Sequence, residues 1–291
     1  MSEREGSQRE REMSWRVAVR HRTGYQYGSP ARASYNEVRM TPATTGGQHL
    51  LTSRLEIRPD TRPLRYVDYW GTQVHAFDVH VPHTELAVTA VSVVETAGPV
   101  SAPDVGWDTL GSPAVRDRFA ELLAPSRYAV AEEELDAVAR TLRAAGSPAE
   151  TGRAAAHWVH ETLDYVRGAT SVGTTSAEAR DLGRGVCQDF SHLTLALLRS
   201  AGLPARYVSG YLHPRSEGAL DEPVSAESHA WVEFWAGDWI PVDPSNLTEV
   251  AERHVLVARG RDYADVRPLA GVYSGPPAQA LGVTVELTRL R

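Results

Sequence analysis

The chain has 291 residues, of which 42% are hydrophobic and 23% are charged, and its formal net charge is −7. This composition allows a full hydrophobic core in about two folded units and argues against disorder of the whole chain. The acidic balance argues against a nucleic-acid partner, because sequence-independent binding needs an excess of basic side chains.

The chain contains one cysteine and no lysine, so all 30 of its basic residues are arginine. A single thiol excludes an intramolecular disulfide and any structural zinc site with two or more thiolates. The opening segment, residues 1–14, is charged and lacks the apolar stretch of a signal peptide. Because no run of about 18 apolar residues occurs either, we expect a cytoplasmic protein with no membrane span or membrane partner.

The first predicted unit, residues 15–98, is rich in β-strands and follows the lead at 1–14, which we expect to be disordered. Apolar and aromatic side chains alternate with polar ones between Trp15 and Tyr27, which is typical of a half-buried strand. Further β-prone segments lie at 53–57 and 74–96, separated by glycines and prolines. Short strands with turn signals at this spacing predict an antiparallel sheet of roughly 80 residues.

Residues 99–150 are predicted to form a helical connector, because the hydrophobic period changes there from two to about 3.6. One helix is expected to begin at Ser112–Pro113 and to carry apolar residues along one side as far as Leu123. A second is expected from about Ala131 to Ala145. Ser147 and Glu150 then form a capping box, which predicts the start of a third.

The last predicted unit, residues 151–291, contains another helix and then strands. The helix is expected to begin near Cys187 and to stop at Gly202. The expected strands are Ala205–Leu212, Ser228–Trp235, Trp239–Val242 and a final alternating strand with Leu281, Val283, Val285 and Leu287 on one face. Helices followed by antiparallel strands predict an α+β fold.

Cys187 has the sequence context of a nucleophile. The glycine-bounded loop Gly183–Gly185 is followed at once by an apolar helix, so Cys187 falls in or near the first turn. The unpaired amides and the dipole at a helix N-terminus favour the thiolate, which is the reactive form. The alternative is a buried cysteine that acts only as a small hydrophobic residue.

His229 and Asp243 lie on two β-prone segments, on either side of Gly237, that we interpret as a hairpin. A three-residue loop would place Trp235 opposite Trp239 and would bring His229 and Asp243 onto the same face as diagonal neighbours. Diagonal Cβ atoms are roughly 7–8 Å apart, which is within side-chain reach. A two-residue loop would put Asp243 on the opposite face, so the predicted contact depends on an odd loop.

A cysteine and a histidine oriented by a carboxylate form a nucleophile–base–orienter arrangement. Here His229 would take the Cys187 proton and return it to the leaving amine, while Asp243 would fix the histidine tautomer. Taken singly, the histidine and the aspartate also fit structural roles, at a strand edge and in a turn. Taken together they favour catalysis over the alternative, a binding module that keeps the fold without turnover.

Three segments of the chain resemble the core of bacterial transglutaminase-like proteins: GVCQDFSHLTLALLRSAGLPARYVSGYL from Gly185, SHAWVEFW from Ser228 and WIPVDPSN from Trp239. HRTGYQY, YVDYWGTQVHAFDV and PHTEL are similar to the β-rich domain that accompanies this core in bacteria. GRDYADVRPLAGVYSG, from Gly260, is similar to the family's tail. The resemblance spans roughly residues 15–290, with small departures such as Gly71-Thr72 and VDPSN that do not touch the candidate triad.

The resemblance implies a papain-like α+β core with a Cys–His–Asp triad at Cys187, His229 and Asp243. It also implies acyl transfer on a protein or peptide substrate, because the family includes cross-linkers, peptidases and amidases. We lean towards hydrolysis, since water at about 55 M outcompetes an amine unless the site binds and orients that amine.

Other polar and aromatic residues have two possible roles each. Gln188 and Asp189 follow the nucleophile and would position the loop or the substrate, or Asp189 would cap the helix. Trp231 would line the substrate groove or lie in the core, and we favour the core. The backbone amide of Cys187 would donate to an oxyanion, with a second donor unidentified. His157 and His160 lack a third clustered ligand, so no metal or other cofactor is expected.

Overall fold

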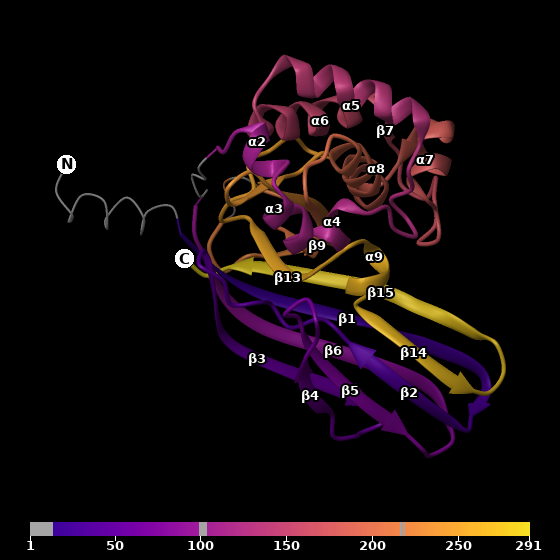
Figure 1. Ribbon diagram of the computed structural model, residues 1–291. Helices are drawn as coiled ribbons and strands as arrows, with labels where there is room; N and C mark the ends of the chain where they lie inside the picture. Colours follow the sequence, from indigo (N-terminus) through magenta and orange to yellow (C-terminus); the bar gives the residue numbers. More distant parts are fainter. Residues whose placement is uncertain (1–13, 99–103, 216, 218) are drawn as a thin grey trace.

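The computed structural model describes residues 14–98, 104–215, 217 and 219–291. Figure 1 shows the helices gathered at one side of the molecule and long strands spanning the other. The expected disordered lead lies outside the described residues except for Ser14. Within the part of the chain that is described, no helix is long and apolar enough to cross a membrane.

Five strands form the longest sheet, in the order β10-β15-β1-β6-β3, and every neighbouring pair is antiparallel. Their bounds are β1 Trp15–Ala31, β3 Gln48–Arg58, β6 His83–Thr96, β10 Pro223–Ala226 and β15 Ala278–Arg289. Burial alternates along the first half of β1, as the hydrophobic pattern predicts.

A second antiparallel sheet has the order β14-β2-β5-β4, with β2 Ala33–Val38, β4 Leu64–Val67, β5 Gln73–Val79 and β14 Leu269–Ser274. The two sheets enclose a cluster that includes Tyr27, Met40, Phe77 and Leu86. The last two strands of the chain therefore complete sheets whose other long strands come from residues 15–98 (Figure 1). The sequence pattern alone assigns these two strands to the unit at 151–291.

The final strand departs from the predicted pattern at a β-bulge. The β1–β15 register shifts between the pairs Arg22–Thr284 and Gly24–Leu281. Val285 and Leu287 are buried as expected, but Val283 is 56% exposed. A bulge inserts an extra residue and breaks the two-residue alternation, so the predicted single apolar face does not extend past Thr284.

The third sheet has the order β12-β11-β9-β13. Its strands are β9 Ala205–Leu212, β11 Ser228–Trp235, β12 Trp239–Val242 and β13 His254–Gly260. The first three have the predicted bounds, so these strand predictions are confirmed. The mixed fold with antiparallel sheets is the predicted α+β class.

Helix α8, Cys187–Ser200, packs on this third sheet and is buried along nearly its whole length. The elements around it are α5 Glu133–Ala145, α6 Pro148–Thr162, α7 Ser176–Leu182 and the parallel pair β7 Asp164–Tyr165 and β8 Arg184–Gly185. The capping box of Ser147 and Glu150 is confirmed at the start of α6. Gly202 follows α8 with φ 82°, a left-handed conformation that glycine tolerates.

The helix predicted to begin at Ser112–Pro113 is divided in the structure. α3 spans Pro113–Arg118 and α4 spans Ala120–Leu123, with Phe119 between them at φ −114°. The Phe119 ring packs against Trp235 at 5.1 Å between ring centroids. Tertiary packing of this aromatic side chain overrides the local helical pattern. The remaining short helices are α2 Trp107–Leu110 and α9 Tyr263–Val266.

The long sheet and the helical region share one hydrophobic core. A single cluster joins Trp15 of β1 and Leu287 of β15 to Leu193 of α8. The Gln48 side chain accepts from Leu256 N at 2.8 Å and donates to Leu256 O at 2.8 Å, which ties β3 to β13. Apolar packing and direct hydrogen bonds therefore hold the two regions together.

Candidate active site

Cys187 is the first residue of α8, and Asp189 holds that turn in place. The Asp189 Oδ2 atom accepts from Val186 N at 2.8 Å and from the Thr170 hydroxyl at 2.6 Å. A Cβ on Gly185 would lie 2.6 Å from Asp189 Cβ, so the loop before Cys187 requires glycine there. Asp189 is 1% exposed. Its place in the structure is the helix cap, one of the two roles considered.

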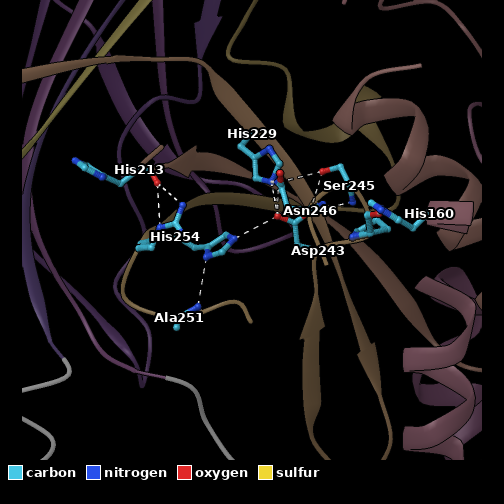
Figure 2. Close-up of polar contacts among 10 residues, drawn as sticks. His160, His213, His229, Asp243, Ser245, Asn246, Ala251 and His254 are labelled. Carbon is cyan, nitrogen blue, oxygen red and sulfur yellow. Dashed lines mark hydrogen bonds and ion pairs between the residues drawn. The ribbon is translucent and has the colours of Figure 1, made fainter. Parts of the chain in front are cut away.

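The hairpin that carries His229 and Asp243 has the predicted odd loop. Trp235 pairs with Trp239, which leaves a three-residue connection. Gly237 in this connection has φ 106°. Asp243 directly follows the end of β12, and its Oδ2 atom lies 2.7 Å from His229 Nε2 (Figure 2). The structure thus brings the two residues into hydrogen-bond contact.

Asp243 accepts hydrogen bonds on both carboxylate oxygens, as Figure 2 shows. Ser245 donates to Oδ1 through its hydroxyl at 2.8 Å and its amide at 3.1 Å. Asn246 Nδ2 donates to Oδ2 at 2.9 Å. Burial raises the pKa of Asp243, but hydrogen bonds from His229, His254 and Asn246 outweigh it and hold the pKa well below its usual range. The carboxylate therefore stays ionised in the folded protein.

His229 contacts both Asp243 and Cys187. Burial lowers the pKa of His229, but hydrogen bonds to Asp243 and Cys187 outweigh burial and raise this pKa to about 10. Because Nε2 faces Asp243, Nδ1 is the nitrogen left to face the thiol. The imidazole therefore interacts with both the carboxylate and the thiol.

A second histidine, His254 of β13, also reaches the carboxylate. Its Nδ1 accepts from Ala251 N at 3.3 Å, which leaves the proton on Nε2, 3.5 Å from Asp243 Oδ2. Burial lowers the pKa of His254 even though Asp243 raises it, so His254 is a neutral donor. Sequence reasoning missed this residue, because a histidine in an apolar strand is usually structural.

His229, Asp243 and His254 offer ligand atoms within 4.8 Å of one another, a set that zinc accepts in proteins. Two atoms bound to one zinc ion at 2.0–2.1 Å and a tetrahedral angle lie about 3.3 Å apart. The 2.7 Å separation of His229 Nε2 from Asp243 Oδ2 is shorter than that. Hydrogen bonding accounts for the geometry of this cluster.

Trp231 and Gln188 lie beside the site but turn away from solvent. Trp231 is 1% exposed and stacks against His229 with 6.1 Å between ring centroids. This burial matches the favoured core role and leaves no Trp231 surface for a substrate. Gln188 is 9% exposed and donates to Val172 O at 3.3 Å, so it holds the neighbouring loop.

A cleft of about 520 Å³ opens beside His229. Tyr165 and Arg167 line it on the side of Cys187, Ser225–His229 line another wall, and Val283–Val285 of β15 close it. Burial and the charge of Cys187 raise the pKa of Tyr165, whereas the Cys187 backbone N–H lowers it. The Tyr165 hydroxyl therefore lies next to that N–H, a placement that sequence reasoning missed.

Two family models match the chain. Residues 17–95 match the bacterial transglutaminase-like N-terminal region, and residues 136–244 match the transglutaminase-like superfamily. The second match contains Cys187, His229 and Asp243.

The chain also has long and short matches to individual proteins. It is 48% identical over 277 residues to an uncharacterised protein of Mycobacterium leprae, which covers 95% of this chain and 99% of that relative. A protein-glutamine gamma-glutamyltransferase of Pseudomonas aeruginosa is 33% identical over 94 residues, which is 30% of this chain and 14% of the relative. The solved structure of a candidate cysteine protease from Cytophaga hutchinsonii has a TM-score of 0.76 at 22% identity, covering 96% of this chain and 91% of that one. This likeness establishes a shared fold.

Proposed function

Because the chain belongs to the transglutaminase-like superfamily, we propose that it catalyses acyl transfer on amide bonds through Cys187, His229 and Asp243. The observation that carries the proposal is the position of His229. The His229 Nε2 atom lies 2.7 Å from the buried Asp243 carboxylate, and the imidazole ring also has a hydrogen-bonding interaction with the Cys187 thiol. These contacts support a nucleophile–base–orienter arrangement of the kind that thiol acyl-transfer enzymes use.

The reaction proceeds in two halves. The Cys187 thiolate attacks the amide carbonyl carbon, and His229 donates a proton to the departing nitrogen, so that a thioester forms as the C–N bond breaks. Water or an amine then attacks the thioester. His229 accepts the proton of that second nucleophile, and the C–S bond breaks to restore the thiolate. Asp243 stabilises the imidazolium whenever His229 is protonated.

The oxyanion of each tetrahedral intermediate needs donors close to the sulfur. The Cys187 backbone N–H is the first, and the Tyr165 hydroxyl beside it is our proposed second. Tyr165 lines the cleft, so its hydroxyl is accessible to a substrate bound there. Such donors act most strongly in a site from which water is partly excluded.

The charges around the cleft favour hydrolysis over transfer to an amine. Of the acidic residues nearest the motifs, Glu227 lies 3.2 Å from Arg167 and Glu222 lies 3.0 Å from Arg215. Both carboxylates are already paired with an arginine, so neither is a dedicated site for an ammonium group. Without such a site an amine has no effective-molarity advantage over water.

The test is product analysis by mass spectrometry. The enzyme is incubated with a library of glutamine-bearing peptides and millimolar methylamine. We expect deamidated or cleaved peptides to exceed methylamine-substituted peptides, and Cys187→Ala to form neither. Equal turnover by Cys187→Ala would exclude the thiol mechanism. Dominant methylamine incorporation would instead make the protein a transglutaminase in the strict sense.

A further inference from the structure

The pairing of the short edge strand β10 with β15 ends next to the cleft. β10 pairs with β15 from Pro223–Thr288 to Ala226–Val285. The chain then enters β11, where Ser228 pairs with Tyr211 of the other sheet. From Thr284 back to Ala278, β15 pairs with β1 on one side and with no other described strand on the other. The place that β10 would occupy if it continued is part of the cleft.

Backbone groups of β15 point into this opening. Asp221 N donates to Arg289 O at 2.8 Å, so the backbone groups of Arg289 face β10. Leu290 N donates to Arg16 O at 2.7 Å, so the next residue faces β1. Strand alternation then turns Val285 toward the β10 side, whereas Val283 lies in the bulge, where the β1–β15 register gives it no partner on β1. Val285 is opposite Ala226, the last residue of β10. Val283 lies beyond the end of β10, and at the bulge the residues between Thr284 and Leu281 do not pair with β1.

The open edge lines the same cleft as His229. Val283, Thr284 and Val285 form one wall, and Ser228 and His229 belong to another. Arg167 and Glu227 pair with each other in this cleft, and Arg253 donates to the His213 carbonyl, so these charged side chains already have partners. Recognition that depends on backbone hydrogen bonds suits such a surface better than recognition of one apolar or charged side chain.

We propose that the substrate is an extended polypeptide segment that pairs with the free edge of β15 near Val283, as a continuation of β10. This inference rests on the proposed function and names its substrate class. The pairing strand would pass His229 with its scissile or side-chain amide presented to Cys187. Strand addition of this kind obtains affinity from main-chain hydrogen bonds and tolerates varied side chains.

The first test traps the complex on the wild-type enzyme. A glutamine peptide whose side-chain amide is replaced by a chloromethyl ketone forms a C–S bond with Cys187 and releases chloride. Hydrogen exchange of this adduct is compared with that of enzyme alkylated by chloroacetamide, which modifies the same thiol without a peptide. We expect slower exchange in residues 281–284 of the peptide adduct alone. Equal exchange in the two adducts overturns the proposal.

The second test uses N-methylated versions of a peptide that the enzyme turns over. Each N-methyl group removes one backbone donor, so strand pairing predicts that kcat/KM falls about tenfold at alternate positions and little at those between. A uniform effect, or none, contradicts pairing. These outcomes are separate from the thiol mechanism, which fails only if Cys187→Ala keeps its turnover of the unmodified peptide.

Discussion

The ionised form of Asp243 is stabilised by neighbouring hydrogen-bond donors, because the residue is only 2% exposed to solvent. Ser245, Asn246 and His254 supply donors that water would otherwise provide. These hydrogen bonds together offset the free-energy cost of burying the Asp243 carboxylate. The arrangement also fixes which carboxylate oxygen faces His229, and so it sets the orientation of the imidazole.

Asp243→Asn is therefore expected to fold and to lose most activity. The amide keeps the shape of the side chain but presents a donor to His229 or favours the wrong tautomer, an effect that lowers kcat about 10⁴-fold in a serine triad. Steady-state kinetics would measure the loss, and thermal unfolding would check the fold. Activity within about tenfold of wild type would remove Asp243 from the mechanism.

A separate prediction concerns Tyr165, because only its hydroxyl group is proposed to donate a hydrogen bond to the oxyanion. Tyr165→Phe is expected to lower kcat about 10²-fold, with a smaller change in KM, since the hydrogen bond strengthens in the transition state. Alkylation of Cys187 by iodoacetamide forms no oxyanion, so its rate serves as the control. If kcat is unchanged, the second oxyanion donor is another group.

His229 links stability to pH. Its folded-state pKa is raised from 6.5 to about 10, so the folded protein holds the proton more tightly than the unfolded chain does. The resulting stabilisation is complete below pH 6.5 and is lost as the pH rises to 10. The free energy of unfolding of wild type relative to His229→Gln should fall over this window, by at most about 1.4 kcal/mol per pH unit. Urea titrations at several pH values would measure it, and a constant difference would contradict the raised pKa.

Residue-level prediction succeeded where the information was local. A glycine-rich loop before an apolar helix was enough to place Cys187, and the loop parity was enough to bring His229 to Asp243. The roles of Ser245 and His254 depend on how the chain turns after Pro244 and on where β13 packs. Neither is encoded in a short periodic pattern, so sequence reasoning missed both.

At the scale of elements, Glu233 joins three strands of the third sheet, β11, β9 and β13. From β11 it contacts Arg206 of β9 at 2.6 Å and Arg259 of β13 at 2.8 Å. Its side chain is 8% exposed. The three charged groups are thus largely buried, and removing one partner of a buried ion pair is costly because the other charge is left uncompensated.

Glu233→Ala is expected to destabilise the protein by about 3–5 kcal/mol, because it leaves two guanidinium groups without their buried partner. Glu85→Ala is the matched control. It breaks an exposed pair with Arg22, whose side chains are 54% and 44% exposed, and should cost about 0–1 kcal/mol. Chemical denaturation of both variants would compare the costs, and similar values would show that the buried cluster contributes no special stability.

Element prediction was accurate for short strands with clear boundaries and failed where packing or pairing intervened. Three strands of the third sheet, β9, β11 and β12, have their predicted bounds, since alternation and flanking turns define them locally. The division at Phe119 comes from its contact with Trp235, and the β15 bulge comes from pairing with β1. Both depend on partners more than 100 residues away in sequence, as their residue numbers show.

At the scale of the whole molecule, the two ends of the described chain lie in one sheet, β15 beside β1 (Figure 1). Alternation predicts that residues 278–289 form a strand, but it carries no information about the partner. This closure places the C-terminal strand beside the cleft. If β15 binds the substrate, the β-rich region is part of the recognition surface and not only a neighbouring fold.

The absence of lysine from the entire sequence gives the last prediction. A cross-linking enzyme at high concentration modifies its own lysines, and this chain has none to modify. Exposed glutamines such as Gln26 and Gln279 remain as acyl donors, whereas Gln48 is buried. Wild-type enzyme should therefore form no lysine-linked multimers, whichever nucleophile resolves the thioester.

A designed lysine separates the two activities. Arg54→Lys introduces an amine at a side chain that is 76% exposed on β3. If hydrolysis dominates, as we expect because Glu222 and Glu227 are already paired with arginine, concentrated Arg54→Lys remains monomeric on a denaturing gel under reducing conditions. The reductant removes disulfides through Cys187, and Arg54→Lys combined with Cys187→Ala reports background. Multimers that form with Arg54→Lys, but neither with wild type nor with the double variant, would show that this protein transfers acyl groups to protein amines.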